Sequence, residues 1–157
     1  MTALPAAAAG YHLAQANVGR LLEPLDHPCI AGFVAWLGPL NALADASPGF
    51  VWRLQTDAGD ATAVRAFDDD DTLLINMSVW ESPQALWDFV YASRHLDALR
   101  RRRDWFERLA EAVTVLWWVP AGTVPAQEDA VRRLALLRRE GPSPAAFTFR
   151  EPFPASG

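Results

Sequence analysis

Apolar and polar residues alternate along several short stretches of the chain, and a period of two is typical of β-strands. In residues 11–18 this alternation places Leu13, Gln15 and Asn17 on one face and mainly alanine and valine on the other. Residues 72–80 are the strongest strand candidate, because one of their faces is apolar throughout. Further strands are expected at 50–56, 62–67 and 113–119, with turns at 57–60 and 68–71.

Apolar residues at helical spacing predict three helices between these strands. The first covers residues 28–45, and Gly38-Pro39 in its middle predicts a kink, before a loop at 45–49. The last covers residues 126–140 and stops at Gly141-Pro142.

The middle helix has a clear start signal at Ser82-Pro83, where serine can cap the helix and proline suits its first position. The pattern continues to about residue 112, with or without a break near Ser93. The tail at 146–154 is rich in proline and aromatic residues, and it is expected to lie extended on the body of the protein.

With the small hairpin strand set aside, the order of elements is β-α-β-β-α-β, which is the ferredoxin-like arrangement of an α+β protein. One domain is expected over residues 1–157, with a core at 11–140, an added C-terminal helix and a proline-rich tail at 141–157. An antiparallel sheet with helices on one face needs cover on the other. A second copy of the sheet is one solution, so a homodimer through the sheet face is expected.

The two faces of the predicted sheet differ in character, and the apolar face is expected to meet the helices. The opposite face mixes polar and apolar groups, which is typical of small-molecule pockets. The alternative is a solvated face that happens to include a tryptophan. The polar members of the mixed face are Gln15, Asn17, Arg53, Gln55, Asn76 and Ser78, and its apolar members are Leu13, Val51, Leu74 and Trp80.

Composition narrows the possible functions. The chain has 157 residues, 51% of them hydrophobic, and a net charge of −5, which favours a packed domain and disfavours nucleic-acid binding. Its basic residues are all arginine, so Schiff-base chemistry on lysine is excluded. The one basic run, Arg100 to Arg103, spreads around a helix. The single cysteine, Cys29, fits a reducing cytoplasm, and neither a signal peptide at Leu4 to Ala9 nor a membrane span is expected.

Several motifs carry a family resemblance. Four stretches resemble a bacterial family of unknown function: Phe50 to Gln55 (FVWRLQ), Asn76 to Ser82 (NMSVWES), Phe89 to Tyr91 with His95, and Val115 to Gly122 (VLWWVPAG). That family is similar to the dimeric α/β-barrel superfamily, which includes the antibiotic-biosynthesis monooxygenases. The resemblance implies the ferredoxin-like fold and a dimer, but it does not decide the reaction.

The resemblance also singles out His95. In haem-binding members of the superfamily the axial histidine comes from the corresponding helix, so His95 would be the ligand if haem is bound. A role for His95 in substrate binding or proton transfer is an equal alternative to haem ligation, while a structural hydrogen bond to the backbone is the commoner arrangement for such a histidine. In cofactor-free members, aromatic walls and amide donors hold a phenolate-like substrate. Asn76 and Arg53 with His95 could then be catalytic, while Gln15, Asn17, Gln55, Ser78 and Trp80 bind the substrate.

Other chemistry finds little support in the sequence. His12 and His27 do not form a metal-ligand spacing with cysteine or carboxylates, so no metal site is expected. Asp68 to Asp71 lack the spacing of a calcium loop and are expected to be a solvated turn. No Gly-x-Ser-x-Gly motif surrounds Ser78 or Ser82.

Three functions therefore remain open. The leading one is a monooxygenase-like or isomerase-like enzyme that acts on an aromatic or polyketide-like substrate and needs no cofactor. The second is a haem-binding protein with His95 as ligand. The third is a small-molecule-binding module without catalysis.

Overall fold

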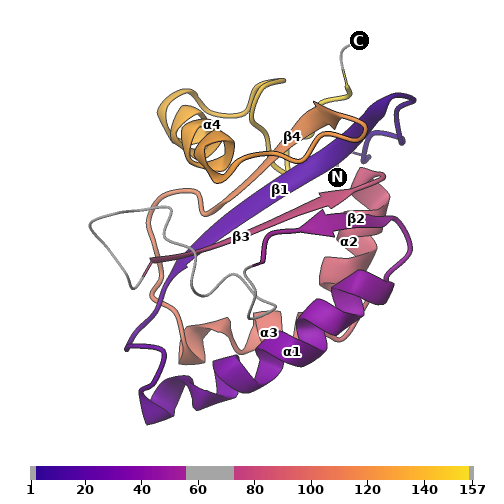
Figure 1. Cartoon of the computed structure of the whole chain (residues 1–157). Coiled ribbons are helices and arrows are strands. Elements are labelled where there is room, and N and C mark those ends of the chain that lie inside the picture. The colour runs from indigo at the N-terminus through magenta and orange to yellow at the C-terminus, as the bar shows by residue number, and fades with distance from the viewer. Residues whose placement is uncertain (1–2, 56–72, 156–157) are drawn as a thin grey trace.

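The strands form one antiparallel sheet, seen in the computed structural model that describes residues 3–55 and 73–155 (Figure 1). The strands are β1 (Tyr11–Arg20), β2 (Phe50–Arg53), β3 (Leu73–Trp80) and β4 (Thr114–Pro120), and they lie in the order β2-β3-β1-β4. This is the strand order of the ferredoxin-like fold, with the first and last strands of the chain side by side. The predicted α+β class is confirmed.

The central strand, β1, pairs antiparallel with both β3 and β4 over most of its length. The edge strand β2 ends at Arg53, earlier than the predicted 56, although the Leu54 amide still donates to the carbonyl oxygen of Met77 at 2.9 Å. The predicted strand at 62–67 and the turns at 57–60 and 68–71 lie outside the described residues.

The first helical segment consists of a short 3-10 turn, η1 (Pro28–Ile30), and the helix α1 (Ala31–Ala46). The helix continues through Pro39, where the sequence predicts a kink. The stretch Pro28–Ala46 has the length and apolar composition of a membrane span, with a mean hydropathy of 1.3. Packed helices of other domains meet the same two criteria, so the stretch is weak evidence for a membrane.

The predicted long middle helix is instead three short segments. They are α2 (Pro83–Tyr91), α3 (His95–Arg100) and the 3-10 turn η2 (Arg102–Asp104). The start is as predicted, because Ser82 Oγ accepts a hydrogen bond from the Ala85 amide at 3.1 Å. The break near Ser93 is also present, whereas the extension of the helix to 112 is wrong.

Tertiary pairing explains why the helix does not continue. The amide of Leu22 donates to the Trp105 carbonyl, and the amide of Glu107 donates to the Arg20 carbonyl, both at 2.8 Å. These bonds hold the chain extended beside the end of β1. Gly19 makes the approach possible, because a Cβ at this position would lie 2.7 Å from the Phe106 ring.

The last helix, α4 (Gln127–Glu140), matches the prediction and ends at Gly141, whose φ of 78° suits glycine. The tail then returns along β4 of the same subunit. Phe147 and Leu116 exchange backbone hydrogen bonds of 2.8 and 2.9 Å, and Trp118 Nε1 donates to the Phe153 carbonyl at 2.8 Å. The predicted extended tail is confirmed as cover for its own sheet edge.

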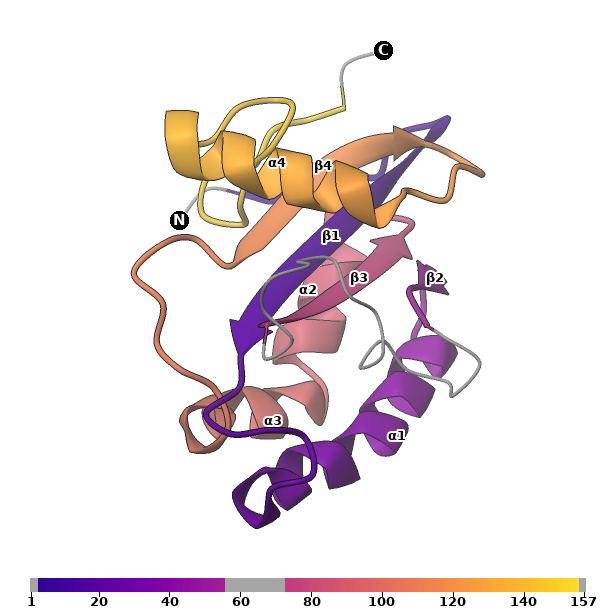
Figure 2. The same ribbon diagram turned by 60° about the vertical axis from the view of Figure 1, so that its left-hand side comes forward.

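Helices cover both faces of the sheet, with α4 on one side and α1, α2 and α3 on the other (Figure 2). The apolar face packs under α4, where Met77 and Trp117 meet Leu134. The mixed face packs under the other three helices, so the expectation that it lies open is wrong. The physical reason is that the added helix α4 covers the more apolar face. The predicted homodimer cannot form through an open sheet face, because helices of the same chain cover both faces. A dimer through another surface stays a prediction.

Candidate functional site

The core beneath α1, α2 and α3 is divided into two apolar clusters. One, the Trp80 cluster, lies toward the start of β1, and the other, the Trp105 cluster, lies toward its end. The buried members of the Trp80 cluster are Leu13, Ala44, Trp80, Leu86, Leu116 and Phe147. The buried members of the Trp105 cluster are Leu21, Ile30, Leu74, Ala98 and Trp105.

A polar strip occupies the interval of the sheet between these clusters. Strand register defines it, since Leu13 faces Trp80 in one cluster and Gly19 faces Leu74 in the other. The two cross-strand pairs between them are Gln15 with Ser78 and Asn17 with Asn76. The sequence predicted these four residues for one face, and the structure brings them into contact.

Direct hydrogen bonds join the polar strip. Gln15 Nε2 donates to Asn76 Oδ1 at 2.8 Å and to Ser78 Oγ at 2.7 Å. Asn17 Nδ2 donates to Gln15 Oε1 at 3.1 Å and to Asn76 Oδ1 at 3.3 Å. Gln15 and Ser78 are buried, at 5% and 7% exposure, so these bonds offset a desolvation cost of about 1–3 kcal/mol for each unsatisfied group.

The strip contains hydrogen-bond donors that no acceptor in the described residues uses. Ser78 Oγ accepts from both Gln15 and Trp80 Nε1, so its lone pairs are used and its proton remains. Within the described residues no acceptor is bonded to that proton or to the Asn76 amide nitrogen. Asn76 is exposed and Asn17 is half-buried, so the strip is accessible from the Asn17 and Asn76 end.

Trp80 closes the other end of the strip. It is fully buried, stacks on Phe89 with ring centres 5.2 Å apart, and meets the edge of Phe50 at 5.5 Å. Its indole nitrogen donates to Ser78 Oγ at 2.8 Å and so fixes the orientation of that hydroxyl. The predicted contact between Trp80 and a substrate stays a prediction. Sequence analysis named Phe89 as part of a family motif but did not predict its contact with Trp80.

His95 lies in the layer of helices, between residues that pack in the Trp80 cluster and a residue that packs in the Trp105 cluster. Phe89 and Val90 belong to the Trp80 cluster, and Ala98 belongs to the Trp105 cluster. The imidazole packs on the Phe89 ring, with ring centres 4.9 Å apart, and its Nδ1 lies 3.3 Å from the Val90 carbonyl oxygen.

The surroundings of His95 favour its neutral form. Burial lowers the pKa of His95 below its ordinary value of 6.5, and the hydrogen bond to the Val90 carbonyl opposes that change. A carbonyl can only accept, so Nδ1 carries the proton and Nε2 keeps a lone pair. The ring is therefore arranged as a base. No hydrogen bond joins it to the polar strip within the described chain.

Arg53 faces the same side of the sheet as the strip, because it is opposite Ser78 in the β2–β3 register. Its guanidinium makes a bidentate ion pair with Asp45 of α1. Arg53 Nε donates to Asp45 Oδ1 at 2.8 Å, and Arg53 Nη2 donates to Asp45 Oδ2 at 3.2 Å. This pair links β2 to α1. Gln55 follows the end of β2 and is exposed. Asp45 is a member of this arrangement that the sequence pattern did not reveal.

The sequence of this chain matches one known family. The chain matches the family described as Domain of unknown function (DUF3291) over residues 12–157. It belongs to that family. No curated protein sequence matches it.

Two solved structures resemble this DUF3291 protein in outline. One is SnoaB, a cofactor-independent oxygenase from Streptomyces nogalater, with a TM-score of 0.46 and 15% identity over 72% of this chain and 95% of the other. The second is a putative antibiotic biosynthesis monooxygenase from Chloroflexus aurantiacus J-10-fl, with a TM-score of 0.44 and 15% identity over 73% and 97%.

A metal or haem site in the DUF3291 protein would need ligating side chains. Its described residues hold no group of three or more histidine, cysteine or acidic side chains suited to a metal ion. His27 accepts a bond from the Cys29 amide at 3.1 Å and caps η1, while His12 lies in β1, beside Val119 of β4. His95 keeps a lone pair on Nε2, as a haem ligand requires, and haem ligation by this residue stays a prediction.

Proposed function

We propose that this protein binds a small hydroxylated aromatic molecule at the polar strip and oxidises it with molecular oxygen. The observation that carries the proposal is the network of Gln15, Asn17, Asn76 and Ser78 between two apolar clusters. A packed core does not need a buried glutamine and serine bonded to two amides nearer the surface, whereas a ligand with an apolar ring and a hydroxyl group can use them. Oxygen as the co-reactant rests on the sequence resemblance to the monooxygenase superfamily.

Each residue has a distinct part in this proposal. The amide of Asn76 and the hydroxyl of Ser78 donate hydrogen bonds to the oxygen of the substrate, and Gln15 and Asn17 hold them in place. The neutral His95 accepts the phenolic proton at Nε2. Arg53 positions β2 against α1 through Asp45, and Trp80 orients Ser78.

The reaction is balanced without a cofactor. A phenol with a hydrogen at the para carbon reacts with one O₂ molecule, which supplies the new carbonyl oxygen and leaves its second oxygen as water. The substrate provides the electrons and loses two hydrogens, so 1-naphthol gives 1,4-naphthoquinone.

We expect the protein to act in the cytoplasm, in agreement with its one cysteine.

The test measures oxygen uptake and quinone formation with 1-naphthol. Replacing Asn76 with alanine removes one donor and is expected to lower kcat/KM by about 10²-fold, as for other donors of this kind. Arg53→Ala breaks the ion pair with Asp45 and should also lower kcat/KM. Gln84→Ala is the matched control, because Gln84 is an exposed amide whose partner is Asp88 on its own helix.

The outcomes of this test distinguish the proposed oxygenase from a non-catalytic binding module. Turnover that is normal in both Asn76→Ala and Arg53→Ala contradicts the proposed site. Binding of 1-naphthol that depends on Asn76, without oxygen uptake, keeps the ligand site and replaces the oxygenase by a non-catalytic binding module.

A further inference from the structure

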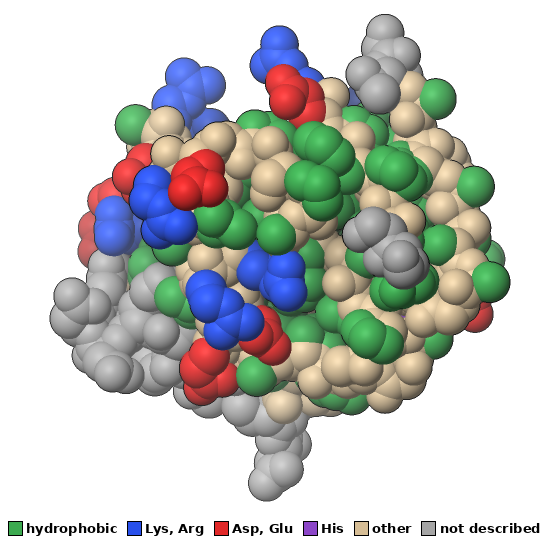
Figure 3. All heavy atoms as spheres, turned by 90° about the horizontal axis from the view of Figure 1, so that it is seen from above, with side chains coloured by type: hydrophobic (Ala, Val, Ile, Leu, Met, Phe, Trp, Pro, Cys, Tyr) green, Lys and Arg blue, Asp and Glu red, His purple; other side chains and the backbone are tan. Residues whose placement is uncertain are grey.

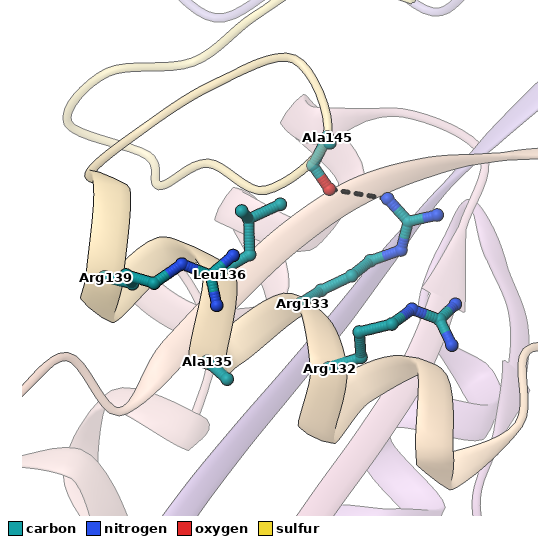
Figure 4. A pocket seen from close by; sticks show the side chains of 6 residues that line it. All are labelled: Arg132, Arg133, Ala135, Leu136, Arg139 and Ala145. Carbon is teal, nitrogen blue, oxygen red and sulfur yellow. Dashed lines mark hydrogen bonds between the residues drawn. The ribbon is translucent and has the colours of Figure 1, made fainter.

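A hollow lies against α4, on the opposite side of the sheet from the polar strip. Its volume is about 440 Å³, and six residues line it: Arg132, Arg133, Ala135, Leu136, Arg139 and Ala145 (Figure 4). Figure 3 looks down on the surface that carries α4, where arginine and acidic side chains lie among hydrophobic ones.

Two of the three arginines at this hollow have carboxylate partners. Arg132 bonds Asp129 one turn earlier on α4, and Arg139 lies 3.6 Å from Glu140. Arg133 differs, because its hydrogen bond goes to the backbone carbonyl of Ala145. The positive charge of Arg133 therefore has no contacting carboxylate in the described part of the chain.

Arg133 is also held in a fixed position. Its guanidinium lies over the Trp117 ring, 5.6 Å from the ring centre, and its Nε is buried without a hydrogen-bond partner in the described residues. Burial lowers its pKa, while the more distant Asp129 opposes that change. Such a charge gains from any anion that comes within contact distance.

The walls of the hollow define what kind of anion could enter. Ala135 and Leu136 of α4 supply an apolar surface, and Ala145 belongs to a tight turn closed by paired backbone bonds between Ser143 and Ala146. An apolar wall beside a fixed cation suits a molecule with both an apolar body and an acidic group.

We propose that the hollow beside α4 binds a small carboxylic acid with an apolar body, whose carboxylate pairs with Arg133. The site is separate from the polar strip, because the sheet lies between them. The acid would bind as an anion at neutral pH, with its chain along Ala135 and Leu136. Arg132 and Arg139 at the rim add long-range attraction that their own acidic partners reduce.

Calorimetric titration with octanoate and with its neutral analogue octanamide tests this assignment. Octanoate should bind the wild-type protein, and Arg133→Met should weaken it about tenfold or more, the loss expected for one charge-assisted hydrogen bond. Methionine keeps an apolar contact with Trp117. Arg150→Met, at an exposed tail position, is the matched control and should bind octanoate as the wild type does.

Three further measurements make the result specific. Ala135→Trp fills the hollow without changing charge and should prevent octanoate binding. The Arg133 Nε–H signal in NMR spectra should shift on addition of octanoate, and Asn76→Ala should leave the affinity unchanged. Equal binding by wild type and Arg133→Met, octanamide binding as tight as octanoate, or no binding at millimolar concentration would overturn the assignment.

Discussion

At the scale of single residues, the sequence predicts the arrangement of the polar strip better than it predicts the surroundings of His95. The strip residues share a face because strand periodicity is strict, so that shared face could be predicted, whereas the register that pairs Gln15 with Ser78 required the structure. The environment of His95 could not be predicted, because it depends on how α2 ends and on the Phe89 ring beside it. The bidentate pair between Arg53 and Asp45 was equally hidden, since it joins a strand to a helix across a turn.

The lowered pKa of His95 predicts how stability changes with pH. The unfolded chain takes up this proton near the ordinary value of 6.5, and the folded chain takes it up only at lower pH. The unfolded state therefore binds more protons in that window, and the contribution of His95 to stability is lost as pH falls through the folded pKa.

The melting temperature is the measurement for this residue. The wild type should lose more stability than His95→Gln between about pH 7.5 and about pH 5.5, because only the wild type has an imidazole to protonate. Carboxylates that titrate over the same range are common to both proteins and cancel in the comparison. Parallel curves for the two proteins would contradict the buried, neutral state of His95.

At the scale of elements, local signals predicted where helices begin better than where they end. Ser82 and Pro83 are sufficient to start α2, whatever surrounds them. The end of the same helical region is set by pairing of residues 105–107 with the end of β1, which is a contact between distant parts of the sequence. Helical periodicity alone carries no information about such a partner.

The cap of α2 gives a direct prediction. Ser82→Ala removes the acceptor for the Ala85 amide and should lower the free energy of unfolding by about 1 kcal/mol. Ser82→Asp supplies another acceptor and should retain most of that stability. Chemical denaturation of the three proteins checks both values, and an alanine variant as stable as the aspartate variant would show that the cap is not needed.

At the scale of the whole molecule, the fold was predictable and the cover of its faces was not. Alternation along β1 and β3 distinguishes two faces but does not say which helix packs on which. The choice depends on α4, whose apolar side meets Met77 and Trp117 and leaves the mixed face to the other helices. The sequence therefore predicted that Gln15, Asn17, Asn76 and Ser78 share a face, while their position beneath α1 to α3 required the structure.

The tail is part of this cover, and its removal should be costly. Phe147 is fully buried in the Trp80 cluster and bonded to Leu116 on the edge of the sheet. Phe147→Ala should lower the free energy of unfolding by about 3–5 kcal/mol, the usual range for a buried phenylalanine. Phe149→Ala, at a half-buried position, should cost clearly less. Denaturant titration compares them, and equal losses would contradict the packing of the tail.

The division of the helix-facing core has a consequence for how this protein can change. Apolar residues in place of Gln15, Asn17 and Asn76, with Ser78 kept for Trp80, would join the two clusters into one continuous core. Such a protein would gain apolar contacts and lose its hydrogen-bonding surface. At these positions, a substitution that raises stability therefore weakens ligand recognition. Selection for heat resistance alone would therefore tend to erase the strip, whereas selection on a changing ligand could vary it without disturbing either cluster.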